Sequence, residues 1–191
     1  MLFRSKVPRS QATGKVITVR WVDINKGGEI NPNYRSRLVA RETNTKANPD
    51  MFAATPPTEA LKPMIAIAAT KDSKGRRRRL MVNDVSLAYF YAKAIRKVYV
   101  EIAEEDREPG EGDMVGELLH SMYGTRDAAQ NWQEEFSNML ESIGIRSGRS
   151  SPCIFYHEER DIRTFVHGDD YVSAGNSDDL VWVRQRLEDR K

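Results

Sequence analysis

Two apolar runs near the C-terminal end of the chain, residues 162–166 and 171–174, are separated only by the four residues HGDD (167–170). A connection this short joins antiparallel strands, because parallel pairing needs a crossover of about a dozen residues or more. Glycine and aspartate are also typical turn residues. The pattern therefore predicts a β-hairpin that carries Asp169 and Asp170 at its tip.

Short strands and helices are predicted along the rest of the chain. Residues 16–23 and 34–41 alternate apolar and polar side chains, and the intervening NKGGE (25–29) is turn-like, so a second hairpin is expected. Residues 80–84 form a short apolar strand that ends in Asp84. Further strands are expected at 97–102, 115–122 and 153–156, and helices at 61–68, 126–143 and 178–188, with Gly144 as a helix cap. This mixture predicts an α+β fold.

Composition excludes several classes of protein. The chain has 191 residues, of which 30% are charged and 39% hydrophobic, as in soluble globular proteins. No apolar run approaches the roughly 18 residues of a membrane span, and no secretory signal is recognisable at the start. Cys153 is the only cysteine, which excludes an intramolecular disulfide or a multi-cysteine zinc site. We therefore expect an intracellular protein without a membrane partner.

The net charge of +2 hides an uneven distribution along the chain. Residues 1–48 carry ten Lys or Arg against three Asp or Glu, residues 71–96 carry eight against two, and residues 97–141 carry three against twelve. Basic blocks suit a polyanion such as nucleic acid, although a solvated surface is the more common reason for charge runs alone. In particular, the run 76–79 fits either a nucleic-acid backbone or a solvated loop.

The aspartates predict a metal site if their strands are neighbours. Asp84 ends one strand, and Asp169 and Asp170 occupy a hairpin tip. A cluster of carboxylates is costly unless cations neutralise it, and hard oxygen ligands suit Mg²⁺. Two such ions support in-line phosphoryl transfer. The alternative is that the Asp pair is ordinary turn chemistry and that Asp84 caps a helix.

Five segments in order resemble the motifs of one polymerase family. They are YRSRLVAR (34–41), DMFAATP (50–56), VNDVSLAYFYA (82–92), SMYGTRDAAQNW (121–132) and VHGDD (166–170). The chain resembles the reverse transcriptases of copia-type retrotransposons over about residues 14–187, and the last three segments are similar to polymerase motifs A, B and C. His167 and Gly168 depart from the aromatic and the larger apolar residue usual in motif C.

The resemblance implies a role for each matching residue. It implies that Asp84, Asp169 and Asp170 are catalytic and, with the backbone carbonyl of Val85, hold two Mg²⁺ ions, or Mn²⁺ in their place. Tyr89 is implied to exclude a ribose 2′-hydroxyl. The other implied nucleotide-binding residues are Arg35, Arg37, Arg41 and Gly124.

The resemblance also implies a fold and a function. The expected fold is a polymerase palm, an antiparallel sheet backed by helices, at 80–96 and 123–191, with fingers at 14–79 and 97–122. The thumb is expected to be absent or truncated, so that residues 1–191 are a reverse transcriptase fragment of a longer Pol polyprotein. The implied function is RNA-directed DNA polymerase, a nucleotidyltransferase that uses dNTPs on a primed RNA or DNA template. A cytoplasmic particle or the nucleus is the expected location.

Two alternatives remain open at this point. The first is a catalytically inactive retroelement remnant that keeps the fold and binds nucleic acid. Intact Asp84, Asp169 and Tyr89 argue against it, and the missing thumb argues for it. The second is a metal-dependent phosphohydrolase with His167 as its water-activating group, which no other residue supports.

Overall fold

The C-terminal apolar runs form the hairpin that their short connection predicts. In the computed structural model, which describes residues 4–43, 51 and 53–189, β10 (Ile162–His167) pairs antiparallel with β11 (Asp170–Asn176). Only Gly168 and Asp169 connect the two strands. The hairpin belongs to the second of two units into which the chain divides. The first unit comprises Met1–Phe52 and Tyr89–Trp132, and the second Ala53–Ala88 and Gln133–Lys191.

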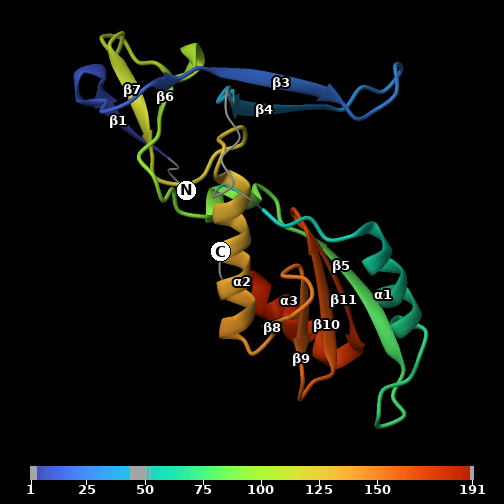
Figure 1. Cartoon of the computed structure of the whole chain (residues 1–191). Helices are drawn as coiled ribbons and strands as arrows, with labels where there is room; N and C mark the ends of the chain where they lie inside the picture. The colour runs from blue at the N-terminus through green and yellow to red at the C-terminus, as the bar shows by residue number, and fades with distance from the viewer. Residues whose placement is uncertain (1–3, 44–50, 52, 190–191) are drawn as a thin grey trace. The chain divides into compact units, whose positions relative to one another are not determined.

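The second unit is built on a five-stranded antiparallel sheet (Figure 1). Strand β11 pairs on its other side with β5 (Arg78–Asp84), which lies at one edge of the sheet. Strand β9 (Ile154–His157) follows β10, and the short β8 (Arg146–Ser147) ends the order β5-β11-β10-β9-β8. The predicted hairpin of β10 and β11 is therefore part of a larger antiparallel sheet, as the resemblance implies.

Helix α1 (Leu61–Ala68) covers one face of this sheet (Figure 1). Its Met64 is buried in a cluster with Phe165 of β10 and with Val172 and Ala174 of β11. The bounds of α1 are those that the apolar spacing predicts, even with Pro63 in the sequence. Pro63 falls in the first turn, where its missing N–H removes no intrahelical hydrogen bond.

The opposite face carries α2 (Ala128–Ser142) and α3 (Ser177–Glu188). The ring of Phe136 on α2 packs edge-on against Phe155 and Tyr171, with centroid separations of 6.0 Å and 6.2 Å. Gly144 ends α2 as predicted: its N–H donates to the Glu141 carbonyl, and the next N–H, of Ile145, donates to Leu140. The sheet is therefore the middle of three layers.

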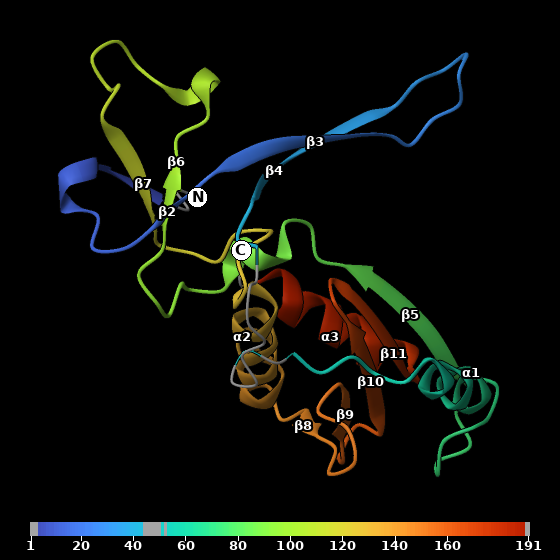
Figure 2. The ribbon, with the colours of Figure 1, turned by 45° about the horizontal axis from the view of Figure 1, so that its top comes forward.

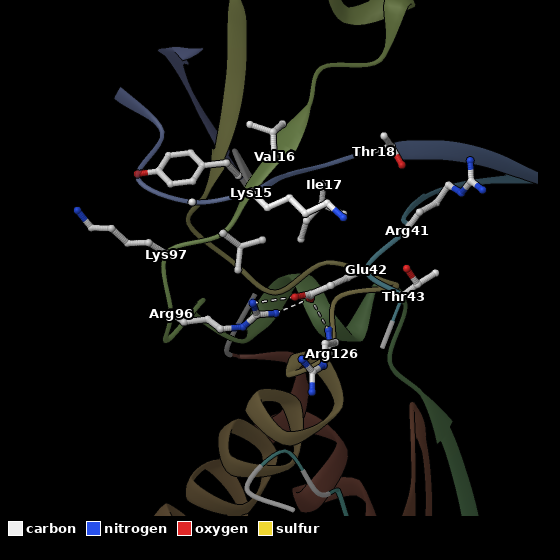
Figure 3. Close-up of a pocket in the computed structure, with 13 residues that line it drawn as sticks. Lys15, Val16, Ile17, Thr18, Arg41, Glu42, Thr43, Arg96, Lys97 and Arg126 are labelled. Carbon is white, nitrogen blue, oxygen red and sulfur yellow. Dashed lines mark hydrogen bonds and ion pairs between the residues drawn. The ribbon is translucent and has the colours of Figure 1, made fainter. Parts of the chain in front are cut away.

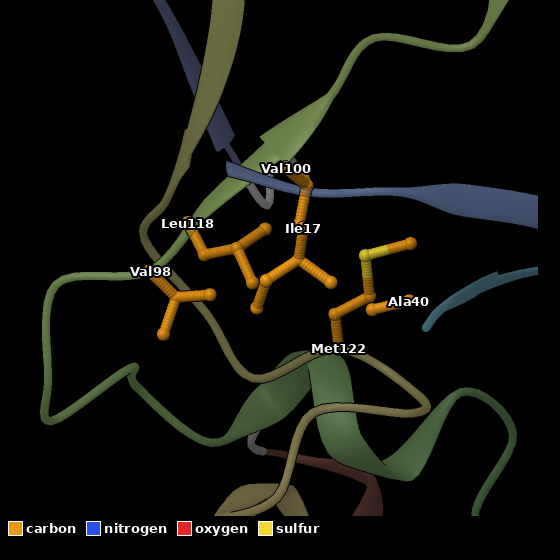
Figure 4. Close-up of a cluster of buried hydrophobic side chains, with 6 residues drawn as sticks. All are labelled: Ile17, Ala40, Val98, Val100, Leu118 and Met122. Atoms are coloured by element: carbon orange, nitrogen blue, oxygen red, sulfur yellow. The ribbon is translucent and has the colours of Figure 1, made fainter. Parts of the chain in front are cut away.

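The first unit contains a four-stranded sheet in the order β1-β7-β6-β2. Its strands are β1 (Arg4–Pro8), β7 (Met114–Leu118), β6 (Tyr99–Glu101) and β2 (Val16–Ile17). Side chains from these strands and their connections point into one apolar cluster (Figure 4). The cluster consists of Ile17, Ala40, Val98, Val100, Leu118 and Met122, all less than 10% exposed.

A two-stranded ribbon completes the first unit. Strands β3 (Val19–Asn25) and β4 (Tyr34–Ala40) pair antiparallel over their whole length (Figure 2). This confirms the second predicted hairpin. Four short 3-10 helices lie in connections of the described chain: η1 (Arg9–Gln11), η2 (Thr58–Ala60), η3 (Ala88–Tyr91) and η4 (Glu104–Asp106).

The α+β class predicted from the sequence is confirmed, with local differences. The predicted strand 16–23 is interrupted at Thr18, which belongs to neither β2 nor β3. The predicted strand 115–122 ends at Leu118. The two units do not follow the bounds that the resemblance implies: residues 53–79, assigned to the fingers, lie in the second unit, and residues 89–96 and 123–132, assigned to the palm, lie in the first. The division into fingers and palm stays a prediction. Over the described residues, no helix is long and apolar enough to cross a membrane.

A charged cluster fixes the connection between β9 and β10 within the second unit. The Asp161 carboxylate accepts hydrogen bonds from Arg78 at the start of β5 and from Arg163 of β10, the latter at 2.7 Å. Asp161 itself has a positive φ of 52°. Burial disfavours the charged carboxylate, but the two guanidinium groups outweigh burial and lower the pKa of Asp161 below its ordinary value.

We predict that Asp161 makes folding sensitive to acid. Because the pKa of Asp161 is lower in the folded protein, its stabilising contribution is present above the ordinary carboxyl pKa of about 4 and is lost as the pH falls through the folded value. Asp161→Asn tolerates the positive φ and removes the charge. The variant should unfold more easily than the parent at pH 7, by urea titration, and the gap should narrow towards pH 3. A gap independent of pH would contradict this.

Candidate active site

Two predicted carboxylates face each other across neighbouring strands. Asp84 is the last residue of β5, Asp170 is the first residue of β11, and the register pairs them directly. Directly opposed residues in an antiparallel pair lie on the same face, with Cβ atoms about 4.5 to 5.5 Å apart. Both side chains are exposed. The sheet therefore places two negative charges side by side at one strand end.

The third carboxylate lies in the turn beside this pair. Asp169 is half-buried, and its backbone carbonyl accepts a hydrogen bond of 2.9 Å from the N–H of Val85, the residue that follows Asp84. Gly168 has a φ of +63°, as the first position of a two-residue hairpin turn requires. The turn thus holds Asp169 against the end of β5. The strand-end aspartates predicted from the sequence are therefore neighbours across the β5–β11 pair.

The donor chemistry of this strand end fits Mg²⁺. Carboxylate oxygens are hard ligands, and Mg²⁺ commonly uses one or two protein carboxylates while water and substrate phosphates complete its shell. Among the residues that the structure describes, no three His, Cys, Asp or Glu side chains gather closely enough to hold a metal ion. The opposed Asp84 and Asp170 supply two carboxylates, which is a number that Mg²⁺ commonly uses when water and phosphates complete its shell.

The β3–β4 ribbon carries a basic face. Arg35 and Arg37 stand two residues apart on β4 and therefore lie on one face. The register places Arg20 of β3 opposite Val39, so Arg20 belongs to the same face. Sequence analysis missed Arg20 because its place depends on the pairing register. Arg41 lies beyond the end of β4, where its backbone N–H donates to the Thr18 carbonyl. Its side chain lines a pocket of the first unit (Figure 3).

An aromatic cluster links two predicted residues, Tyr89 and Arg37, within the first unit. The ring of Tyr123 lies 4.6 Å from that of Tyr89 and 5.7 Å from that of Phe90, measured between centroids. The Arg37 guanidinium lies 5.3 Å from the Tyr123 ring centroid, within the range of a cation–π contact. Tyr123 had a single signal in the sequence, its place beside Gly124 in the segment that resembles motif B.

Gly124 sits directly against strand β4. Its φ is +87°, and a Cβ atom there would lie 2.0 Å from the backbone oxygen of Ala40 and 2.6 Å from the Val39 side chain. The Ala40 N–H also donates to the carbonyl of Tyr123 at 2.8 Å. Only glycine permits this approach, so the structure gives Gly124 a packing reason. Its nucleotide-binding role stays a prediction.

The predicted site residues divide between the two units. Asp84, Val85, Asp169 and Asp170 belong to the second unit, and Arg35, Arg37, Arg41, Tyr89 and Gly124 to the first. Of the five resembling segments, 34–41, 82–92, 121–132 and 166–170 are described throughout. In the segment 50–56, Asp50 and Phe52 lie outside the described residues.

Comparison with known proteins identifies the family of this chain. The family model described as reverse transcriptase (RNA-dependent DNA polymerase) matches residues 6–189. Since this match covers nearly the whole chain, the chain belongs to the reverse transcriptase family.

Curated relatives come from transposons. The chain is 24% identical over 170 residues to the retrovirus-related Pol polyprotein from transposon TNT 1-94 of Nicotiana tabacum, covering 85% of the chain. It is 25% identical over 189 and 182 residues to those from transposons RE2 and RE1 of Arabidopsis thaliana, covering 95% and 92%. The chain spans 12% of the length of each relative. The resemblance to copia-type retrotransposon reverse transcriptases is thereby confirmed.

We predict that Gly124→Ala disrupts the first unit. The added methyl group forces β4 and the loop apart and strains the backbone, and overpacking and left-handed strain each cost about 1 to 3 kcal/mol. Urea unfolding should therefore show a loss of stability of about 2 to 6 kcal/mol. Gly28→Ala, which adds a methyl group where no atom lies within 4 Å, is the matched control and should change stability by less than about 1 kcal/mol. Equal effects of the two substitutions would refute the close approach.

Proposed function

We propose that this chain carries the nucleotidyl-transfer site of an RNA-directed DNA polymerase. The observation that supports this most directly is the register that opposes Asp84 and Asp170, with Asp169 in the adjoining turn, in a member of the reverse transcriptase family. In the proposed reaction, the primer 3′-hydroxyl oxygen forms a bond to the α-phosphorus of a dNTP, and the bond to pyrophosphate breaks. The primer grows by one nucleotide.

The role proposed for the carboxylates is to hold two Mg²⁺ ions, with Mn²⁺ as a substitute. Asp84 and Asp170 supply opposed oxygens, and Asp169 and the Val85 carbonyl are the further ligands proposed. When bound, such ions lower the pKa of an attacking hydroxyl and stabilise charge on a leaving phosphate oxygen. The protein's own contribution is a fixed negative strand end, which the β5–β11 pairing holds rigid.

The role proposed for the first unit is to bind the nucleotide. Arginine forks match phosphate oxygens, so Arg35 and Arg37 are assigned to the triphosphate and Arg20 joins them on the same face. The Arg37 Nε atom is buried and has no hydrogen-bond partner among the described residues, as expected of a group that awaits an acceptor. Tyr89 is assigned to the sugar, where the bulk of its ring would exclude a 2′-hydroxyl. Template, primer and the remainder of a Pol polyprotein are the proposed partners.

The main alternative is an inactive remnant that binds nucleic acid. The intact carboxylates favour activity, but a chain that spans 12% of its relatives' length is a small part of such a polyprotein. Primer extension separates the two functions, because a remnant would bind primed template without extending it.

We predict that Asp84→Asn abolishes primer extension on a primed RNA template with Mg²⁺. Loss of one ligand charge should lower the rate at least about a hundredfold, because even outer-shell changes at metal sites cost about 10- to 100-fold. Asp189→Asn, an exposed aspartate of α3's C-terminal cap, is the charge-matched control and should retain activity. If the parent chain binds primed template but extends it no faster than Asp84→Asn does, the inactive-remnant function holds instead.

We predict that Tyr89→Ala relaxes the choice of sugar. Removing the ring removes a clash with the 2′-hydroxyl, so incorporation of rNTPs should rise relative to dNTPs in single-turnover assays. Tyr89→Phe keeps the ring and should keep the selectivity of the parent. The ring of Tyr89 also packs against Tyr123. If Tyr89→Ala changed stability alone and left the ratio of rNTP to dNTP incorporation unchanged, packing would be the whole role of Tyr89.

A further inference from the structure

The connection between β8 and β9 is an exposed loop of the second unit. Strand β8 lies at the edge of the five-stranded sheet opposite to β5, so the loop is separate from the carboxylates at the end of β5 (Figure 1). Residues 148–150 and Pro152 are exposed, and Ser151 is half-buried. Cys153 is buried and fixes the end of the loop, because its carbonyl accepts a hydrogen bond of 2.9 Å from Val166 of β10. Exposed loops between fixed ends are the segments that other proteins reach most easily.

The middle of this loop is held by weak hydrogen bonds. The Gly148 N–H donates to the Ile154 carbonyl at 2.7 Å and closes the base of the loop. Within the loop, the Ser151 carbonyl accepts from the Ile154 N–H at 3.3 Å, and the Ser151 hydroxyl oxygen accepts from the Cys153 N–H at 3.4 Å. Both distances are longer than is usual for an N–H···O bond. The segment around Ser151 can therefore extend into the cleft of an enzyme without opening the sheet.

Ser151 is followed by an exposed proline. The sequence contains two Ser–Pro or Thr–Pro dipeptides, Ser151–Pro152 and Thr55–Pro56. Pro152 is exposed and Pro56 is buried, so the first dipeptide presents its proline to another protein and the second does not. Proline has no N–H and a fixed φ, which makes it a distinctive residue beside an acceptor hydroxyl. This combination is typical of sites that proline-directed serine kinases modify.

Two arginines flank the same loop. Arg146 lies in β8 and Arg149 in the loop, and both are exposed. Among the residues that the structure describes, neither side chain has a hydrogen-bond, ion-pair or ring partner. The chain turns back at this point, since a Cβ atom at Gly148 would lie 3.5 Å from the Ser151 carbonyl oxygen. Ser151 is therefore folded against the segment that carries both guanidinium groups.

The two arginines line a pocket of about 480 Å³. Its other charged lining residues are Glu158 and Glu159, from the connection between β9 and β10, and neither forms an ion pair in the part of the chain that the structure describes. Two positive and two negative charges balance, so the pocket does not concentrate free anions. A phosphate attached to the loop needs no such attraction, because its covalent tether gives it a high local concentration.

We propose that Ser151 is a phosphorylation site of a proline-directed serine kinase and that its phosphate binds Arg146 and Arg149. In this reaction, the Ser151 hydroxyl oxygen forms a bond to the γ-phosphorus of ATP, and the bond from that phosphorus to the β–γ bridging oxygen breaks. ADP leaves, and the hydroxyl proton passes to a carboxylate of the kinase. The phosphate carries a charge of about −1.5 to −2 at pH 7, which suits two guanidinium forks. The proposal goes beyond nucleotidyl transfer and does not depend on it.

The first test treats the full chain with a purified mitogen-activated protein kinase and Mg²⁺-ATP, and peptide mass spectrometry locates the phosphate. Ser151 should be modified, and Thr55 should not, because Pro56 is buried. Pro152→Ala should abolish the modification although the hydroxyl remains, and thermal unfolding checks that this variant is folded. An unmodified Ser151 in the parent chain would overturn the proposal, as would equal modification of Thr55 or a Ser151 that is still modified in Pro152→Ala.

The second test measures the second pKa of the phosphoserine by phosphorus NMR titration. That pKa is about 6 without a partner, and two guanidinium groups favour the dianion, so we expect it to be lower by at least about 0.5 in the phosphorylated parent. In phosphorylated Arg146→Gln/Arg149→Gln the lowering should disappear. Arg77→Gln/Arg79→Gln, which removes two exposed arginines around the start of β5, is the matched control and should keep it. The same pKa in all three proteins would overturn the binding of the phosphate by Arg146 and Arg149, and with it the proposal.

Discussion

The register between β5 and β11 is the constraint on which the candidate site depends. Side chains alternate along a strand, so a slip of one residue would move Asp84 to the opposite face from Asp170. The layers above and below the sheet prevent this slip. Helix α1 buries Val172 and Ala174 on one face, and Phe136 packs on Tyr171 on the other. Two apolar surfaces with different residues thus fix the position of a polar pair that contributes nothing to the core.

Much of the fold was predictable because its signals are local. Helix α1, the end of α2 at Gly144 and both hairpins follow from apolar spacing, turn residues and caps within a few positions. The sheet β1-β7-β6-β2 was not predicted. Strands β1 and β7 are separated by about a hundred residues, and the sequence of neither strand indicates which segment it pairs with. Non-local pairing depends on the whole chain, and a periodic pattern carries no information about it.

The residues of the candidate site likewise differ in how far the sequence predicts them. Asp84, Asp169 and Asp170 were recognisable because each stands at a strand end or a turn. Arg20 and Tyr123 were not, since Arg20 joins the basic face only through register and Tyr123 meets Tyr89 and Arg37 only through loop packing. The same limit applied to Arg41, which the resemblance groups with Arg35 and Arg37. It lies just beyond the end of β4 and lines a pocket of the first unit, which the sequence pattern does not indicate.

The position of β5 at the edge of its sheet has a consequence for solubility. An edge strand presents unpaired N–H and C=O groups to which another chain can add, and exposed Leu80 and Val82 increase the apolar surface there. Charges stand at both ends of β5: Arg78 and Arg79 begin the strand, and Asp84 ends it. A second copy that paired in parallel register would bring like charges together, whereas antiparallel pairing would bring Asp84 towards arginine. The aspartate at the candidate site therefore also sets the direction in which a second copy could add to this edge, because it disfavours parallel addition alone.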